Sequence, residues 1–69
     1  MISYQRLWKK IEKDGVTQYR LMKEGISSST LMRLRRNENV NTDTLNKLCS
    51  ILNCKVEDIV EYIKDTNSK

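Results

Sequence analysis

The stretch from Thr17 to Leu34 constrains the fold more than any other, because it reads as two helices joined by a glycine turn. Thr17 precedes a helical run and is a preferred residue type at an N-cap. Gly25 stands where the chain has to reverse, and glycine adopts the positive φ that ends a helix without a Cβ clash. The stretch therefore predicts a helix over Thr17–Glu24, a tight turn, and a second helix over Ser28–Arg35.

The second of these helices has two unlike faces. One face collects Ser27, Thr30, Leu31 and Leu34, and the other collects Ser28, Ser29, Met32, Arg33 and Arg36. Small hydroxyl groups followed by guanidinium groups suit the phosphates and base edges of a nucleic acid. We therefore expect a helix-turn-helix whose second helix enters the major groove of double-stranded DNA.

The placement of charge supports this expectation more than its total does. The 69 residues carry a formal net charge of +4. Residues 1–36 hold nine Lys or Arg against three acidic residues, whereas residues 37–69 hold four against six. The first half thus has the field that a polyanion requires. A merely solvated basic surface is the alternative reading of the same residues.

Outside this stretch, apolar residues recur with the i, i+3, i+4, i+7 spacing of amphipathic helices. Ser3 is expected to cap the first of three further helices, Asn41 or Thr42 the second, and the third is expected to open near Lys55. The spacing occurs at Tyr4, Leu7, Trp8 and Ile11, at Leu45, Leu48, Cys49 and Leu52, and at Val56, Ile59, Val60 and Ile63.

Short polar connections separate the five predicted helices. Gly15 and Asn53 follow two of them, and both residue types adopt the left-handed conformation that ends a helix. No strand pattern competes. The sequence therefore predicts an all-α fold, a compact five-helix single domain over residues 1–69, with its core at about 3–64 and a polar tail at 65–69.

Several side chains outside the central stretch are assigned to the core. Tyr4 and Trp8 share a stripe with aliphatic residues and are expected to pack inside rather than bind a ligand. Val40 is the apolar residue of a polar connection and is expected to return to the core. Tyr62 lies off the stripe of the last predicted helix, so it is either exposed or part of a dimer interface.

Metal and enzyme chemistry find little support. The chain has two cysteines, Cys49 and Cys54, and no histidine, so a structural zinc site would lack ligands. A disulfide between them is the alternative, but we expect two reduced thiols that pack as small hydrophobic side chains. There is no nucleophile beside a base and no glycine loop that cradles phosphate. We expect no cofactor, no metal and no enzyme activity.

A membrane location is not expected either. No apolar run approaches the roughly 18–20 residues that span a bilayer. The first residues become charged too early for a signal peptide. The expected location is the cytoplasm.

Two motifs resemble those of a known family. The first is Thr17-Gln18-x-x-Leu21 followed by Gly25-Ile26-Ser27-x-x-Thr30-Leu31-x-x-Leu34. The second is Thr44-Leu45-x-x-Leu48-Cys49-x-x-Leu52-Asn53-Cys54-x-Val56-x-Asp58-Ile59. Together they resemble the Cro/C1-type (XRE-like) helix-turn-helix regulators of bacteria and phages. The resemblance implies a five-helix fold that binds double-stranded DNA as a homodimer and regulates transcription.

The resemblance also implies which residues contact DNA. Arg33 is expected to form a bidentate contact with guanine, Met32 to touch a thymine methyl group, and Gln18 to bind a phosphate. The expected base contacts are Ser28, Ser29, Met32 and Arg33. The expected contacts to the DNA backbone are Thr17, Gln18, Arg35, Arg36, Asn37 and Asn39.

One departure from the family pattern lies in the turn. Leu21 is followed by Gly25 after four steps, where the family usually has five. Either the first helix of the pair ends one residue early or the turn is tighter. Met22 stands where a small alanine is common, which predicts a longer side chain at the crossing of the two helices.

A second function is compatible with the same fold. The chain would then be a protein-interaction module, such as an antitoxin or a partner of a larger regulator. The acidic second half and the last predicted helix would carry that contact.

Overall fold

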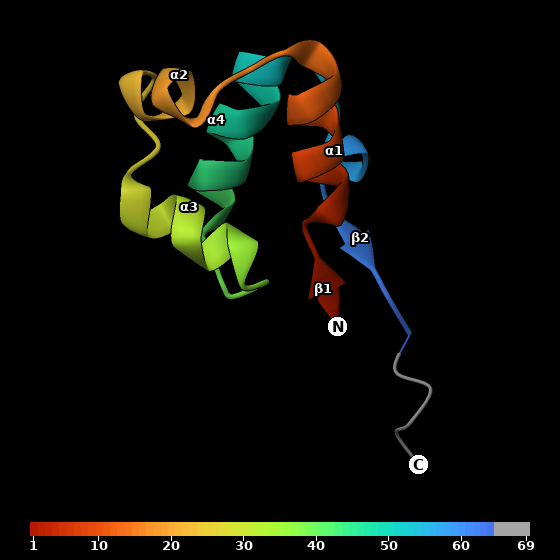
Figure 1. The fold of residues 1–69 in the computed structure, drawn as a ribbon. Coiled ribbons are helices and arrows are strands. Elements are labelled where there is room, and N and C mark those ends of the chain that lie inside the picture. Colours follow the sequence, from red (N-terminus) through yellow and green to blue (C-terminus); the bar gives the residue numbers. More distant parts are fainter. Residues whose placement is uncertain (65–69) are drawn as a thin grey trace.

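The apolar stripes of four α-helices meet at one core in the computed structural model, which describes residues 1–64. The helices are α1 (Gln5–Asp14), α2 (Gln18–Lys23), α3 (Ser28–Arg35) and α4 (Thr42–Leu52) (Figure 1). A single 3₁₀ turn, η1 (Val56–Asp58), follows α4. Two short strands, β1 (Ile2–Ser3) and β2 (Glu61–Tyr62), lie at the two ends of the described chain. The predicted polar tail at 65–69 lies outside the described residues.

The core confirms most of the predicted stripes. In Figure 1, α4 stands between α1 and the pair formed by α2 and α3. Each of the four helices contributes buried apolar residues to the one core. Val40 and Trp8 are half-buried and pack against this core, and Tyr4 is buried within it, as predicted. The buried apolar residues are Tyr4, Leu7, Ile11, Leu21, Ile26, Leu31, Leu34, Leu48, Leu52 and Ile59.

Side-chain caps begin three of the helices. The Thr17 hydroxyl accepts the Arg20 N–H at 3.1 Å, and this bond confirms Thr17 as the cap of α2. Ser27 caps α3 by accepting the Thr30 N–H at 3.2 Å. Of the two candidates before α4, Asn41 is the cap. Each such bond satisfies a backbone donor that has no partner inside the helix.

The start of α1 differs from the prediction. Ser3 is buried in β1, and the N-cap position of α1 falls on Tyr4, which makes no side-chain cap bond. The Ser3 hydroxyl still accepts the Gln5 N–H at 3.2 Å. The residue therefore orders the first turn from one position further out than expected.

The predicted fifth helix is wrong. Residues Val56–Asp58 form only a 3₁₀ turn, and the chain then extends into β2, which pairs antiparallel with β1. Ile59 is buried as the stripe requires, but Val56 is 50% exposed and Ile63 is 39% exposed. The four apolar residues of this stripe are all β-branched and so favour extended backbone. The fold is thus mostly helical, with four α-helices and a two-stranded sheet in residues 1–64, rather than all-α with five helices.

Hydrogen bonds and an ion pair hold the segment from η1 to β2 against β1 and α1. The register pairs Ile2 with Tyr62, and the Ile63 N–H donates to the Met1 carbonyl at 2.8 Å. Arg6 of α1 donates to the Glu57 carbonyl at 2.9 Å, and its Nε lies 3.3 Å from the carboxylate of Glu61. These contacts replace the packing that a fifth helix would provide.

No helix within residues 1–64 combines the length and the apolar character needed to cross a membrane.

Replacing the α3 cap tests the local account of this helix. We expect Ser27→Ala to lower the free energy of unfolding by about 1 kcal/mol, because the Thr30 N–H loses its acceptor. Ser28→Ala is the matched control, since Ser28 is exposed inside the helix, and its effect should stay within about 0.5 kcal/mol. Urea unfolding followed by circular dichroism measures both. Equal losses in the two variants would contradict the assignment of the cap.

Candidate nucleic-acid interface

The turn between α2 and α3 is closed by backbone hydrogen bonds around Gly25. Gly25 has a φ of 108° and donates its N–H to the Met22 carbonyl at 3.1 Å. The next residue, Ile26, donates to the Leu21 carbonyl at 3.0 Å, and both of these side chains are buried. This is the Schellman pattern, in which two carbonyls at the helix end are satisfied and an apolar contact closes the turn.

The short spacing between Leu21 and Gly25 is therefore accommodated by an early helix end. α2 stops at Lys23 after six residues, and Glu24 forms its C-terminal boundary. Met22, expected at the crossing of the two helices, is 43% exposed and is not part of the buried core. The turn positions α3 through Leu21 and Ile26 instead.

The outward face of α3 carries the predicted base-contacting residues. Leu31 and Leu34 are buried, whereas Met32 is 51% exposed. The structure brings Ser28, Ser29, Met32, Arg33 and Arg36 together on the exposed side. Ser29 has a partner within the protein, since its hydroxyl lies 3.1 Å from that of Ser27. The polar face expected from the sequence is thus present on α3.

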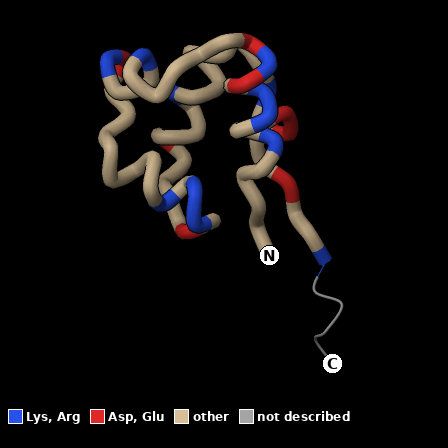
Figure 2. The backbone as a smooth tube through the Cα atoms, viewed as in Figure 1, with Lys and Arg blue, Asp and Glu red and all other residues tan. Residues whose placement is uncertain are grey.

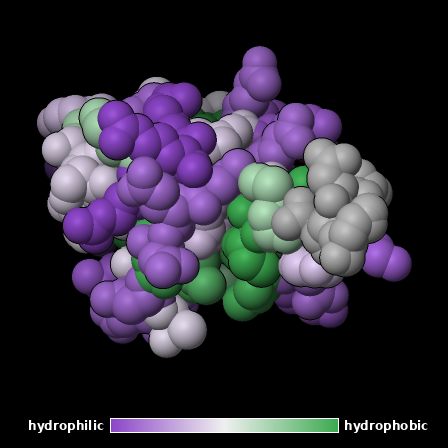
Figure 3. All heavy atoms as spheres, turned by 90° about the horizontal axis from the view of Figure 1, so that it is seen from below, coloured by the Kyte–Doolittle hydropathy of each residue, from purple (hydrophilic) through white to green (hydrophobic). Residues whose placement is uncertain are grey.

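The arginines of this face carry charge that the described chain does not neutralise. Within residues 1–64, the ion pairs join Arg6 to Glu61 and Lys10 to Asp14. Neither Arg33 nor Arg36 takes part in them. Figure 2 shows basic residues gathered at the end of α3, while the first turns of the helix are uncharged. Seen from below in Figure 3, the side of the molecule that holds α2 and α3 is mainly hydrophilic.

Arg35 behaves differently from its neighbours. Its guanidinium group stacks over the ring of Trp8 in α1, with 4.4 Å between the guanidinium carbon and the ring centroid. The indole Nε1 of Trp8 is buried and has no hydrogen-bond partner in the described part of the chain. Arg35 therefore links the last turn of α3 to α1 through a cation–π contact, which the sequence did not reveal.

Asn37 also has a partner within the protein. Its φ of 57° is left-handed, and its Oδ1 accepts the Tyr4 N–H at 2.9 Å. Burial raises the pKa of Tyr4, which lies at this junction. Asn37 thereby ties the end of α3 to the start of α1 while the residue itself stays exposed. Asn39, two residues further on, is exposed.

The remaining predicted contacts lie at the start of α2. Thr17 uses its hydroxyl oxygen as the cap, and Gln18 is exposed in the first turn. Sequence reasoning missed two side chains in this region. Tyr19 is 69% exposed, with the Lys23 amine 5.9 Å from its ring centroid. Lys47 reaches over from α4, so that a methyl group at Gly25 would lie 3.7 Å from its amine.

Two short helices, α2 and α3, are joined at a tight turn in a small, mostly helical domain, and α3 exposes a polar and basic face. Residues 6–65 match the family model of the Cro/C1-type HTH DNA-binding domain, and the chain belongs to this family. The predicted family resemblance is therefore confirmed.

The fold is also that of a solved structure. It resembles the crystal structure of the transcriptional regulator VanUg, form II, with a TM-score of 0.83 and 35% sequence identity. The alignment covers 93% of this chain and 87% of that chain. No match was found among curated protein sequences.

The contact between Arg35 and Trp8 can be tested by fluorescence. We expect Arg35→Ala to shift the emission of Trp8 and to lower the free energy of unfolding by about 0.5–1 kcal/mol, as the cation leaves the ring. Arg33→Ala, two residues earlier in the same helix and without this contact, is the control and should leave the emission unchanged. The same shift in both variants would show that the probe senses loss of charge rather than loss of the stack.

Proposed function

We propose that the protein is a sequence-specific regulator of transcription that binds double-stranded DNA, with α3 as the recognition helix in the major groove. The observation that carries this proposal is the exposed face of α3, where Arg33 and Arg36, which form no ion pair with the described residues, follow a turn of small hydroxyl side chains. Membership of a DNA-binding family supports it, as does the likeness to VanUg, which is a transcriptional regulator.

The proposed roles follow from the position of each side chain on α3. Ser28, Ser29, Met32 and Arg33 face base edges, and Arg33 contributes most of the direct discrimination through a bidentate contact with guanine. Ser29 is already bonded to Ser27, so its role is the smaller of the two serines. The contacts to bases therefore centre on Ser28, Met32 and Arg33.

The backbone contacts divide into two groups. Thr17 and Gln18 approach one phosphate from the start of α2, where backbone N–H groups point outward. Arg36 and Asn39 approach the backbone from the other end of α3. Arg35 and Asn37 act there as well, Asn37 through its amide N–H groups because its Oδ1 already accepts from Tyr4. Arg35 has to share its guanidinium with the ring of Trp8.

Two arginine variants separate base reading from phosphate binding. Sequences selected from random duplex DNA serve as the specific site, and an unrelated duplex serves as the comparison. We expect Arg33→Ala to reduce the preference for the specific site by about 1–3 kcal/mol, the usual value of a good bidentate contact. Arg36→Ala should lower the affinity for both duplexes by the same factor. It should also reduce the slope of log affinity against log salt concentration by about one.

Gel-shift titrations at several salt concentrations measure these quantities. An Arg33→Ala protein that keeps the full preference for its site would exclude Arg33 as the base-reading residue. A folded wild-type protein that binds no selected duplex would favour the alternative function, a protein-interaction module.

We further propose that the protein binds DNA as a homodimer through the face that holds the small sheet. Ile2 and Tyr62 are opposite each other in the register and are 44% and 68% exposed. Met1 and Ile63 beside them are also exposed. An apolar patch interrupts the hydrophilic surface in the view of Figure 3. Exposed apolar groups at adjacent positions favour association, and a domain this small gains from it.

Two equally exposed tyrosines provide a matched test of this interface. Tyr62 is 68% exposed beside the sheet, and Tyr19 is 69% exposed on α2. We expect Tyr62→Ser to weaken self-association and to lower the affinity for a palindromic site, whereas Tyr19→Ser leaves self-association unchanged. Sedimentation equilibrium measures the association constants. Equal behaviour of the two variants, or a wild-type protein that is monomeric both free and on DNA, would contradict the proposed interface.

A further inference from the structure

The end of α4 brings the two cysteines of the chain together. Cys49 lies in the last turn of α4, and the chain reverses at Asn53, whose φ of 52° and ψ of 56° are left-handed. After this reversal, the Cys54 N–H donates to the Cys49 carbonyl at 3.0 Å. The hydrogen bond places the backbones of the two cysteines in contact, and the two side chains leave the same closed turn.

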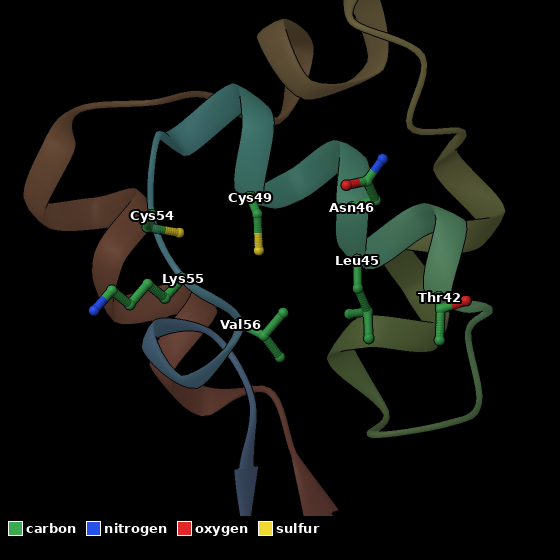
Figure 4. A pocket seen from close by; sticks show the side chains of 7 residues that line it. All are labelled: Thr42, Leu45, Asn46, Cys49, Cys54, Lys55 and Val56. Carbon is green, nitrogen blue, oxygen red and sulfur yellow. The ribbon is translucent and has the colours of Figure 1, made fainter.

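Both thiols open into one pocket. The pocket has a volume of about 500 Å³ and lies between α4 and the segment that leads into η1. Figure 4 shows both sulfur atoms directed into this space, with Leu45 and Val56 on its other walls. Cys49 and Cys54 are free and half-buried. A small molecule in the pocket therefore reaches both sulfur atoms from the same side.

The electrostatics of Cys54 reflect the same proximity. Burial is the main cause that raises the pKa of the Cys54 thiol, and the neighbouring Cys49 raises it further. Asp58 acts in the same direction, while Lys10 of α1 opposes them. Because the thiolate is the reactive form, a raised pKa slows the reaction of Cys54 with an external oxidant. Once one of the two cysteines has reacted, the neighbouring sulfur can attack it and complete the disulfide.

We propose that Cys49 and Cys54 form a reversible dithiol–disulfide site that a low-molecular-weight disulfide oxidises. One cysteine thiolate attacks the external disulfide, forms a mixed disulfide and releases one external thiolate. The other cysteine thiolate then attacks the protein sulfur of that mixed disulfide and releases the second external thiolate. The protein gives up two electrons and two protons, and the oxidant is recovered as two thiols.

The new bond would fix the turn through which α4 passes into the C-terminal segment. This segment holds the buried Ile59, the Lys55 N–H bond to the Asp58 carboxylate at 3.0 Å, and β2. A fold that holds the two thiols together favours the disulfide, and by linkage the disulfide favours the fold by the same factor. The inference does not depend on the proposed DNA binding.

Glutathione redox buffers test the site on the full chain. The reduced protein is equilibrated with reduced and oxidised glutathione, quenched with acid, alkylated and digested with trypsin. Cleavage after Lys47 and Lys55 leaves both cysteines in one peptide, residues 48–55, so that an internal disulfide appears as the loss of two hydrogen atoms. The same titration in concentrated guanidinium chloride gives the equilibrium for the unfolded chain.

We expect the folded chain to form the internal disulfide at a ratio of the oxidised glutathione concentration to the square of the reduced glutathione concentration that is at least about tenfold lower than the unfolded chain requires. Excess reduced glutathione should restore both thiols. An equal or weaker tendency in the folded chain would overturn the proposal, as would a wild-type product that consists mainly of glutathione adducts or of disulfide-linked dimers.

Three variants control the geometry. Cys49→Ser and Cys54→Ser should each stop at a single glutathione adduct under the same conditions. Asn53→Gly keeps a residue that adopts positive φ, so it should retain the preference of the folded chain for the internal disulfide. Circular dichroism establishes that each variant is folded. A folded Asn53→Gly protein that loses this preference would contradict the role of the turn.

Discussion

Every α-helix in residues 1–64 ends in the same backbone motif, a residue in the left-handed conformation that reverses the chain. The motif occurs at two glycines and two asparagines, Gly15, Gly25, Asn37 and Asn53. In each case the N–H of the following residue donates to a carbonyl five positions earlier, at 2.8–3.0 Å. This bond satisfies a carbonyl that the helix leaves open and reverses the chain within two residues. Four short helices can then share one core without long connections.

The same motif fixes how α3 is presented. Ser27 caps the first turn of α3, and Asn37 closes the last turn and accepts the Tyr4 N–H from the start of α1. Arg35 adds a second link between the two helices through the ring of Trp8. The last turn of α3 is thus attached to the start of α1 and to Trp8, and a rotation of α3 about its axis would break these two contacts. The exposed position of Arg33 is therefore a consequence of the fold and not of a flexible side chain alone.

Local patterns predicted most of this structure, because caps, stripes and helix ends depend on residues close together in the chain. Thr17, Gly25 and the stripe of α4 are examples that the structure confirms. The β1–β2 pairing was missed because its partners, such as Ile2 and Tyr62, are 60 positions apart in the chain and each strand has only two residues. So short a strand leaves no period to detect.

The candidate site likewise has features that the sequence predicts and features that it does not. A helical period separates the buried side of α3 from its exposed side, so the outward placement of Ser28, Met32 and Arg33 could be predicted. The period does not say which neighbour a side chain at the border will meet. The family resemblance assigned Arg35 and Asn37 to contacts with the DNA backbone, but their observed partners are Trp8 of α1 and Tyr4 at its N-cap. Tertiary contacts of this kind depend on the direction in which two helices cross.

The distribution of charge shows why such contacts matter for function. By sequence, the basic half of the chain includes α1, α2 and α3, and the acidic half follows them. In the structure, Arg6 of α1 contacts the acidic segment at Glu57 and Glu61, and Lys10 pairs with Asp14. Part of the positive charge of α1 is thus compensated within the protein, whereas Arg33 and Arg36 on α3 have no ion-pair partner among residues 1–64. Arg33 and Arg36 therefore add positive charge to the helix that also exposes the small polar side chains, a combination that suits binding to a duplex.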